Sequence, residues 1–494
     1  MIDAGDFERD WMRARAAMTP DRVAIVAAGG ETSFAELDVR VDAVARALVA
    51  RGVGEGDRVA LLFPNGATFV ELAHAAPRAG AIVVPLNTRL SHDELAWQLR
   101  DAGASLLVYD DLTSAAALAI SAATGVAALH ADEMTQAFGD DPPLRYDRPL
   151  DRVHSIIYTS GTTGTPKGAM LTYGNHAASA AASAANLGVR DDDRLLASLP
   201  MFHVGGLAVL LRGVLYGNAV VVHESFDPGQ VNAAIDRDGV TTISVVANML
   251  RRMLEKRGGV PYPLSLRTVL LGGGPAPREL LEDCARRGLP VLQTYGLTEA
   301  ASQVATLAPA DALRRLGSTG RPLPGTAVRI EGDDGRPCAA GEAGEILVSG
   351  PTVSPGYWQR PAETAAAFRD GWLRTGDAGY LDAEGYLYVL DRRDDLIVSG
   401  GENVYPAEVE SMLQSHPDVV EAAVYGVPDA RWGAVPAAAV VPRPGAVTSE
   451  AELIEWCRGR LARYKSPARV RFVDELPRNA AGKLQRRMLR DRAG

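Results

Sequence analysis

The sequence predicts an α/β protein. Helical stretches alternate with short β-branched runs between residues 19 and 108, and a second such series begins at Leu195. Strands separated by helices of ten to fifteen residues imply crossover connections and a mostly parallel sheet. After Gly317 the sequence pattern changes to short predicted strands separated by Gly, Asp and Pro. We therefore expect a large N-terminal domain of stacked α and β layers, a small β-barrel-like part, and a small α+β C-terminal domain.

The first series contains one long helical stretch and three strands. Residues 34–52 (FAELDVRVDAVARALVARG) are rich in Ala and predict a helix, whereas RVALLF, AIVVPL and SLLVYD predict strands at 58–63, 81–86 and 105–110. In the second series VVVHE, TTISVV, TVLLGGG and PVLQTYG predict further strands. The large domain is therefore expected to contain more than one sheet.

Residues 205–222 are apolar enough to suggest a membrane span. Arg212 lies in the middle of this stretch, and Gly213 and Gly217 interrupt it. Because a spanning helix needs about 20 predominantly apolar residues, we expect a short buried helix followed by a strand, and no membrane insertion.

The C-terminal region carries two further patterns. PGTAVRIEGDDGRPCAAGEAGEILVSG and GDAGYLDAEGYLYVLDRRD predict hairpins of a small antiparallel barrel or sheet. Beyond them, YPAEVESMLQSH and SEAELIEWCRGRLARY predict helices, and VVEAAVYGV, AAAVVPRP and RVRFVDEL predict strands. The charged run at 391–395 separates the two patterns, which predicts a large domain at 1–391 and a small one at 392–494.

The composition excludes several classes of function. A formal net charge of -10, without a basic stripe interleaved with aromatic residues, argues against nucleic acid as a partner. Cys284, Cys338 and Cys457 are widely spaced, which argues against a disulfide framework or a structural zinc site. The acidic N-terminal stretch lacks the features of a secretory signal. A cytoplasmic location is therefore expected.

The stretch YTSGTTGTPKGAM, residues 158–170, gathers small residues and hydroxyls around one lysine. The apolar residues before it predict a strand that leads into the glycines, and converging N–H groups with a cation form an anion cradle. The stretch does not fit G-x-x-x-x-G-K-[ST], because Pro166 replaces the second glycine and Gly168 the hydroxyl residue. A flexible surface turn is the alternative, but the strand and the single lysine favour phosphate binding.

This loop resembles the signature loop of the adenylate-forming superfamily, which includes acyl-CoA synthetases, nonribosomal peptide adenylation domains and luciferases. Other motifs of the superfamily follow in order and cover the chain from about residue 30 to its end. They are LPMFH at 199–203, YGLTE at 295–299, TGD at 375–377, DRRDD at 391–395, SGGENVYPAEVE at 399–410 and LPRNAAGK at 476–483.

The resemblance implies a two-step reaction that uses ATP, Mg²⁺ and coenzyme A. A carboxylate attacks the α-phosphate of ATP to give acyl-AMP and pyrophosphate, and a thiol then attacks the acyl carbon. Joining two anions requires neutralised phosphates and an in-line nucleophile. The residues that the resemblance assigns to the β and γ phosphates are Thr159, Ser160, Gly161, Thr162, Thr163, Gly164 and Lys167.

The resemblance also assigns residues to the nucleoside and the metal. Tyr295 would offer an aromatic face to adenine, Thr298 a hydroxyl to the α-phosphate, and Glu299 an oxygen ligand to magnesium. A helix cap is the alternative for the Thr-Glu pair. Asp377 would accept from the ribose diol, with a turn aspartate as its alternative, and Arg392 would assist at the ribose.

Further assignments lie in the C-terminal domain. Lys483 would follow the charge that develops at the α-phosphate and the carbonyl, and so count as a catalytic residue. Asp394 matches the hinge of the superfamily, where the small domain swings between the half-reactions. Gly400 and Gly401 would line a passage for pantetheine, which a side chain would obstruct, and Glu402 would position this loop. Trp432 would either stack near the thiol donor or lie in an interface.

The acyl site is indicated less directly. Gly272, Gly273 and Gly274 lie beside the expected acyl cavity and leave room for a bulky, even aromatic acid. His203 follows Phe202 in a segment that borders the acyl site in relatives, so we assign it a lining or gating role in the catalytic site.

Within the superfamily, LGGGPAP, YVLDRR and neighbouring stretches resemble o-succinylbenzoate-CoA ligases of menaquinone biosynthesis most. Gly205 is a departure, because a hydroxyl residue is common there in those ligases. Ser302 and Arg212 are the candidates for contacting a second substrate carboxylate. The alternatives are a broader aryl or medium-chain acyl-CoA synthetase, an adenylation enzyme that loads a carrier protein, and a non-catalytic nucleotide-binding relative. The chain could also form a homodimer.

Overall fold

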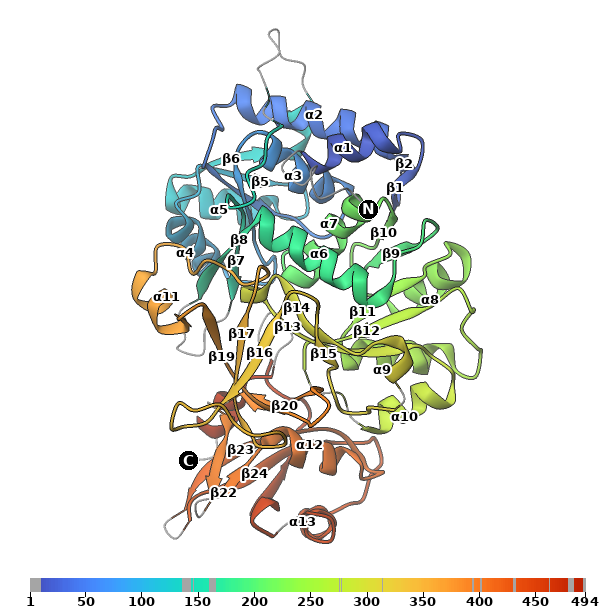
Figure 1. Ribbon diagram of the computed structural model, residues 1–494, viewed down its shortest axis with the longest axis vertical. Helices are drawn as coiled ribbons and strands as arrows, with labels where there is room; N and C mark the ends of the chain where they lie inside the picture. The colour runs from blue at the N-terminus through green and yellow to red at the C-terminus, as the bar shows by residue number, and fades with distance from the viewer. Residues whose placement is uncertain are drawn as a thin grey trace.

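Figure 1 shows the computed structural model of the chain, which describes residues 10–135, 144, 146–159, 166–274, 276, 278–312, 314–392, 395–399, 402–429, 432–461, 463–478 and 484–491. The N-terminal layers lie in the upper part of the view, and the C-terminal elements lie below them. The described strands form four sheets, and the predicted α/β class with an additional antiparallel part is confirmed.

Nine of the described strands form the largest sheet. Its inner strands run parallel, and antiparallel strands form both edges. From one edge to the other they are β15 (Arg321–Pro322), β14 (Ser302–Thr306), β13 (Val291–Leu297), β12 (Thr268–Leu271), β11 (Thr242–Val245), β9 (Arg194–Ala197), β10 (Ala219–Val222), β1 (Val23–Ala27) and β2 (Gly30–Ser33).

A second sheet of six described strands is parallel except for its last pair, an antiparallel hairpin. In order they are β6 (Ala127–His130), β5 (Leu106–Tyr109), β3 (Arg58–Leu62), β4 (Ile82–Pro85), β7 (Val153–Thr159) and β8 (Lys167–Thr172). The strands predicted at 58–63, 81–86 and 105–110 are thus confirmed.

Alternating side chains divide the large domain into layers. On β9, Leu195 and Ala197 pack into the core between the two sheets, whereas Leu196 packs into the core on the other face. Successive strand residues point to opposite faces, so both faces of the sheet must be covered. The central core also takes in α1 (Trp11–Met18), α2 (Phe34–Ala50), α3 (Ala67–Arg78), α6 (Tyr173–Leu187) and α7 (Val204–Tyr216).

Helices also cover the outer faces. α8 (Pro228–Arg237), α9 (Ala247–Arg257) and α10 (Arg278–Arg286) pack on the nine-stranded sheet, and α4 (His92–Ala102) and α5 (Ser114–Thr124) pack on the six-stranded one. The segment tested above as a membrane span is the buried helix α7 followed by β10, as predicted. Among the described residues no helix combines the length and apolar character that crossing a membrane requires.

The hairpins expected after Gly317 form an antiparallel sheet. It contains β16 (Ala327–Glu331), β17 (Gly344–Ser349), β19 (Trp372–Leu381), β18 (Phe368–Arg369) and β20 (Leu387–Arg392), with α11 (Pro361–Ala367) beside it.

The C-terminal elements follow the predicted helix and strand order. They are β21 (Ile397–Ser399), β22 (Glu402–Val404), α12 (Pro406–Gln414), β23 (Val419–Asp429), β24 (Gly433–Pro442), α13 (Glu450–Arg458), β25 (Arg469–Phe472) and α14 (Arg486–Asp491). They enclose a core of their own. The domain boundary and the hinge at 391–395 stay predictions, and Asp394 lies outside the described residues.

Candidate functional site

The glycine-rich loop connects the two strands of the β7–β8 hairpin. Thr159 and Lys167 form the last strand pair before the loop, and the Thr159 hydroxyl donates to the Lys167 carbonyl at 3.4 Å. The predicted strand before the loop is therefore confirmed. The loop residues Ser160, Gly161, Thr162, Thr163 and Gly164 lie outside the described residues, so their phosphate contacts stay a prediction.

Lys167 and Glu299, which the sequence assigns to phosphate and metal, lie on either side of one tyrosine. The Lys167 Nζ lies 5.2 Å from the centre of the Tyr357 ring. The Tyr357 hydroxyl donates to the Glu299 Oε1 at 2.9 Å. The structure therefore brings the two predicted residues to one place through a residue that the sequence did not single out.

The YGLTE motif ends in a turn of unusual backbone geometry. Ala301 and Ser302 have φ values of 49° and 98°, which non-glycine residues adopt rarely. A Cβ on Gly296 would lie 1.6 Å from the Ser302 carbonyl oxygen, so glycine is required there. Thr298 and Glu299 lie in a 3₁₀ turn just before this bend, in which no side-chain cap is formed. The helix-cap interpretation of the Thr-Glu pair is therefore wrong.

A magnesium ion fits Glu299 on the chemistry of the donors. No cluster of three or more His, Cys, Asp or Glu residues in the described ranges could hold a metal by itself. Mg²⁺ is usually held by one or two carboxylates together with substrate phosphates and water. Glu299 is half-buried, and only its Oε1 is occupied by the Tyr357 hydroxyl. Its second oxygen is therefore available to a metal that also binds phosphate.

Tyr295 and Asp377 meet at the other end of the motif. The Tyr295 hydroxyl donates to the Asp377 Oδ2 at 2.6 Å, and both residues are buried. The register of β19 and β20 places Asp377 directly opposite Arg392, whose side chain is not described. The two residues that the sequence assigns to the ribose therefore share one rung of a sheet, next to the tyrosine assigned to adenine.

His203 lies at the start of α7 and packs edge-on against Phe202, with ring centres 4.6 Å apart. Burial and the nearby Arg89 charge lower the pKa of His203 to about 4. Its Nε2 has no hydrogen-bond partner among the described residues. The ring is thus neutral at pH 7, in agreement with a lining role, although that role stays a prediction.

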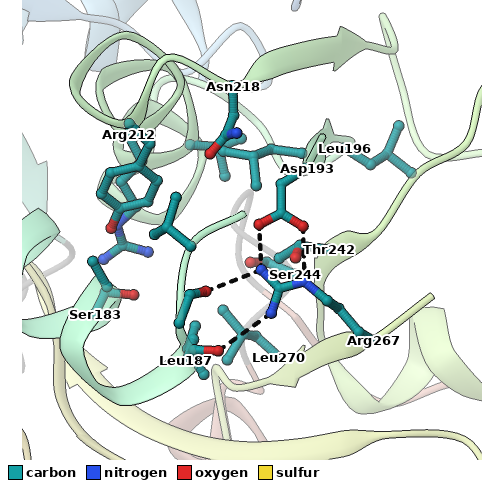
Figure 2. Close-up of a pocket in the computed structure, with 16 residues that line it drawn as sticks. Ser183, Leu187, Asp193, Leu196, Arg212, Asn218, Thr242, Ser244, Arg267 and Leu270 are labelled. Carbon is teal, nitrogen blue, oxygen red and sulfur yellow. Dashed lines mark hydrogen bonds and ion pairs between the residues drawn. The ribbon is translucent and has the colours of Figure 1, made fainter. Parts of the chain in front are cut away.

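A cavity of about 40 Å³ lies between α6, α7 and the nine-stranded sheet. Figure 2 shows Arg212 and Ser183 on one side of it and the Asp193–Arg267 pair on the other. One buried water needs about 10–15 Å³ of such volume, so the cavity has room for a few waters or a carboxylate group. Ser244 and Leu270, which also line it, belong to β11 and β12.

Arg212 is buried in this cavity, and none of the described residues gives it a carboxylate partner. Its Nη2 donates to the Ser179 hydroxyl at 3.3 Å, and its Nε has no partner among the described residues. The Ser179 hydroxyl in turn donates to the Ala301 carbonyl at 2.6 Å. Burial lowers the pKa of Arg212, which means that the site lacks the anion that would offset burial of the charge.

Of the three glycines that follow β12, Gly273 lies beside the exposed Val246. Gly273 has a φ of 80°, and a Cβ there would lie 2.9 Å from the Val246 Cγ1. A Cβ on Gly272 would meet Thr294, whereas nothing lies within 4 Å of one on Gly274. The close approach explains two of the three glycines.

The comparisons with known proteins agree with this arrangement. The AMP-binding enzyme family matches residues 12–358, and the C-terminal domain of AMP-binding enzymes matches residues 408–483. The chain belongs to the AMP-binding enzyme family.

Relatives of the family are similar over nearly the whole chain. The chain is 51% identical to a 2-succinylbenzoate–CoA ligase of Geobacillus kaustophilus, with 97% of each chain covered. It is 44% identical to o-succinylbenzoate-CoA synthetase of Bacillus subtilis in complex with the acyl-adenylate intermediate, with a TM-score of 0.92 and 98% of each chain covered. The same synthetase with ATP and a magnesium ion has a TM-score of 0.91, at 44% identity and 98% coverage of each chain.

Several predicted residues of the family site are not placed by the structure. Lys483, Gly400 and Gly401 lie outside the described residues, and of Glu402 only the backbone is described. Trp432 is 46% exposed. Their roles stay predictions.

Two residues of the site escaped the sequence analysis. Tyr357 lies in SPGYWQR, a loop stretch whose Pro, Gly and two aromatic residues could have drawn attention to it. Ser179 lies in the Ala/Ser-rich run of α6, where nothing distinguishes it from Ser183. Only the folded chain brings each of them to its partner.

Proposed function

We propose that the chain is an AMP-forming acid-thiol ligase that converts o-succinylbenzoate to o-succinylbenzoyl-CoA with ATP and coenzyme A. The naming of the most similar relatives supports this function. The observation in this chain that carries the choice of acid is Arg212. It is a buried guanidinium without a carboxylate partner among the described residues; it lines a cavity and is linked through Ser179 to Ala301, which follows the YGLTE motif.

The first step joins a carboxylate to the α-phosphate of ATP. Lys167 and the loop between β7 and β8 hold the triphosphate, and the Thr298 hydroxyl binds the α-phosphate. Magnesium, held by Glu299, supplies charge neutralisation at the phosphates. Lys483 adds positive charge where the acyl phosphate forms. The nucleophilic oxygen and the phosphorus are thereby held in line while their mutual repulsion is reduced.

The nucleoside is held at the Tyr295 and Asp377 end of the site. The Tyr295 hydroxyl orients one oxygen of Asp377, and a ribose hydroxyl donates to this carboxylate in the proposal. Arg392, opposite on β20, adds a donor. This places the α-phosphate between the ribose and the Lys167 end.

The second carboxylate of the acid binds Arg212 in this proposal. A planar guanidinium can make two parallel hydrogen bonds to a carboxylate. Ser302, whose backbone is bent next to the Ser179–Ala301 contact, is the second candidate. The aromatic ring then lies between the Arg212 end and the reacting carboxylate, near Val246, Gly273 and His203.

For the second step, the small domain reorients about 391–395, and Gly400 and Gly401 line the passage for the thiol. The proposal places the enzyme in the cytoplasm, where ATP and coenzyme A are found and thiols stay reduced. The buried Cys284 and Cys457 are free, as such a location allows.

A substrate panel tests the proposal. Purified protein with ATP and Mg²⁺ is offered o-succinylbenzoate, benzoate or hexanoate, and labelled pyrophosphate exchange into ATP and thioester formation with coenzyme A are measured. We expect kcat/KM for o-succinylbenzoate to exceed that for benzoate by at least about tenfold, because only the dicarboxylate pairs with Arg212. Equal activity on all three acids would remove the assignment of the acid, and no exchange with any acid would remove the ligase assignment.

A further inference from the structure

We propose that Tyr357 is a positioning residue that holds Glu299 for the magnesium–ATP complex and keeps Lys167 from pairing with it. The inference rests on the proposed function. Tyr357 contacts both charged groups, with its ring facing the Lys167 Nζ at 5.2 Å and its hydroxyl donating to the Glu299 Oε1 at 2.9 Å. Neither charged side chain makes an ion pair in the part of the chain that the structure describes.

The tyrosine is held firmly by its own backbone. Tyr357 forms an antiparallel bridge with Ala169 of β8, and its N–H donates to the Thr364 hydroxyl at 3.0 Å. The N–H of the following residue, Trp358, donates to the Gly168 carbonyl at 2.8 Å. The residue is only 8% exposed. These bonds tie the Tyr357 backbone to the strand that begins with Lys167. The two residues are therefore held at a fixed backbone distance, which keeps the ring near the lysine.

The same loop is also tied to the turn that carries Glu299. The Ser354 N–H donates to the Glu299 carbonyl at 2.8 Å, and the Ser354 hydroxyl donates to the Met170 carbonyl at 2.7 Å. From α6, the Asn175 side-chain amide donates to the carbonyls of Pro351 and Val353 at 2.8 and 2.9 Å. The loop therefore bridges the hairpin and the YGLTE turn, and Tyr357 is the side chain that reaches both charges.

The physical advantage lies in keeping two opposite charges apart before the substrate arrives. A direct Lys167–Glu299 ion pair would occupy the groups that phosphate and magnesium need, and breaking it would oppose binding. An aromatic face attracts a cation without neutralising it, and a neutral hydroxyl orients a carboxylate oxygen without removing its charge. Tyr357 thus presents both charges to the substrate in a fixed geometry.

The test measures ATP binding without any acid. ATP-induced stabilisation is followed by thermal shift across a range of Mg²⁺ concentrations, in the parent, in Tyr357→Phe and in Tyr357→His. Tyr357→Phe keeps the ring over Lys167 and removes the bond to Glu299, so the Mg²⁺ concentration for half-maximal stabilisation should rise about five- to tenfold. Stabilisation by ATP without Mg²⁺ should not change. Tyr357→His keeps a ring with an N–H donor and should lie between the parent and Tyr357→Phe.

Tyr262→Phe is the matched control. The Tyr262 hydroxyl donates to the Asn232 side chain at 3.0 Å, and the Arg257 guanidinium lies 4.0 Å from its ring centre, between α8 and α9. This variant also loses one hydrogen bond and keeps one cation on a ring, but its Mg²⁺ dependence should equal that of the parent.

A double-mutant cycle with Glu299→Gln tests whether Tyr357 affects the Mg²⁺ dependence through Glu299. If Tyr357 acts through Glu299, Tyr357→Phe should not change the Mg²⁺ dependence further in the Glu299→Gln background. An equal shift in both backgrounds, an effect that is the same with and without Mg²⁺, or a loss of stability alone would overturn the inference. If Tyr357→Phe is not recovered folded, Tyr357→His decides: a half-maximal Mg²⁺ concentration above that of the parent supports the inference, and one equal to that of the parent overturns it.

The outcomes separate this inference from the proposed function. A parent that exchanges pyrophosphate, combined with Tyr357 variants of unchanged Mg²⁺ dependence, removes only the role of Tyr357. A parent that is not stabilised by ATP and exchanges no pyrophosphate removes the proposed function instead.

Discussion

Arg78 and Arg212 are two of the buried arginines of the large domain, and their surroundings differ completely. Arg78, the last residue of α3, is fully buried and pairs with Asp10 at 2.8 Å, Asp38 at 2.5 Å and Asp42 at 3.1 Å. Among the described residues, the one hydrogen-bond partner of the Arg212 side chain is the Ser179 hydroxyl, at 3.3 Å. Removing either partner of a buried pair leaves a charge uncompensated. We infer that Arg78 stabilises the fold, whereas Arg212 is a candidate to bind an anionic ligand.

The pKa values show the same contrast. Burial alone would lower the pKa of both guanidinium groups. For Arg78 the hydrogen bonds and charges of Asp10 and Asp38 outweigh burial and raise the pKa. For Arg212 burial is the leading cause and the pKa is lowered. A buried cation that is paired with carboxylates of the same chain stabilises the fold. A buried cation that has no such carboxylate is a candidate site for an anionic ligand.

The largest expected effect follows from breaking the complete cluster. Arg78→Met leaves the buried carboxylate of Asp10 without its main partner, and we expect the free energy of unfolding to fall by about 3–5 kcal/mol. Denaturant unfolding measures this. Arg46→Met is the control, because it removes a surface partner of the same Asp42 and should cost less than about 1 kcal/mol. Similar losses in both variants would contradict the structural role of Arg78.

A pH dependence is expected beside the Arg78 cluster. Burial, opposed by the charge of Asp10 and reinforced by that of Arg78, lowers the pKa of His74 to about 4. The unfolded chain binds this proton near pH 6.5, so stability is present above pH 6.5 and is lost as the pH falls toward 4. The loss is on the order of 3 kcal/mol at 1.4 kcal/mol per pKa unit.

His74→Gln should flatten this part of the stability profile. Unfolding free energies of the parent and the variant are compared between pH 4 and pH 7. His92→Gln, which changes an exposed histidine on α4, is the control and should leave the slope unchanged. A His74→Gln profile parallel to that of the parent would show that another group carries the dependence.

Replacing Arg212 should change substrate specificity rather than the free energy of unfolding. In Arg212→Met we expect kcat/KM for o-succinylbenzoate to fall by about 10- to 150-fold, the equivalent of about 1.5–3 kcal/mol for hydrogen bonds to a charged group. Activity on benzoate and the free energy of unfolding should hardly change, since Arg212 forms no ion pair with the described residues. Arg212→Lys should recover part of the activity, because it keeps the charge but not the planar fork. An equal loss on both acids would contradict a role in reading the second carboxylate.

The smallest effect is expected from the serine between Arg212 and the YGLTE turn. Ser179→Ala leaves the buried Ala301 carbonyl without its donor, so stability should fall by about 1 kcal/mol. Because the turn that carries Glu299 loosens, activity should fall a fewfold on both acids alike. Steady-state kinetics with o-succinylbenzoate and benzoate check this. Ser121→Ala, which removes a similar hydroxyl-to-carbonyl bond on α5, is the control, and a loss limited to the dicarboxylate would assign Ser179 to acid binding instead.

Much of the site was predictable because its chemistry is carried by local motifs. The strand before the glycine-rich loop, the helix and strand at 204–222 and the order of elements from 406 onward all follow from residue spacing, and the structure confirms them. The turn after YGLTE was not predictable. The helix cap, which the sequence left as the alternative for Thr298 and Glu299, is not formed, because the close approach of Gly296 to Ser302 forces a bend.

The sequence by itself determined the α/β layers, the buried helix at Arg212 and the motifs that we propose to hold ATP, because hydrophobic period and short motifs are local properties of a chain. The tertiary structure decided which charges are satisfied. Arg78 meets Asp10 across 68 residues, and Tyr357 meets Glu299 across 58. The hydrophobic period predicts which face of a helix or strand a residue occupies. Only the packing of the elements determines which distant residue contacts it. Packing therefore paired Arg78 with three carboxylates and left Arg212 without one among the described residues.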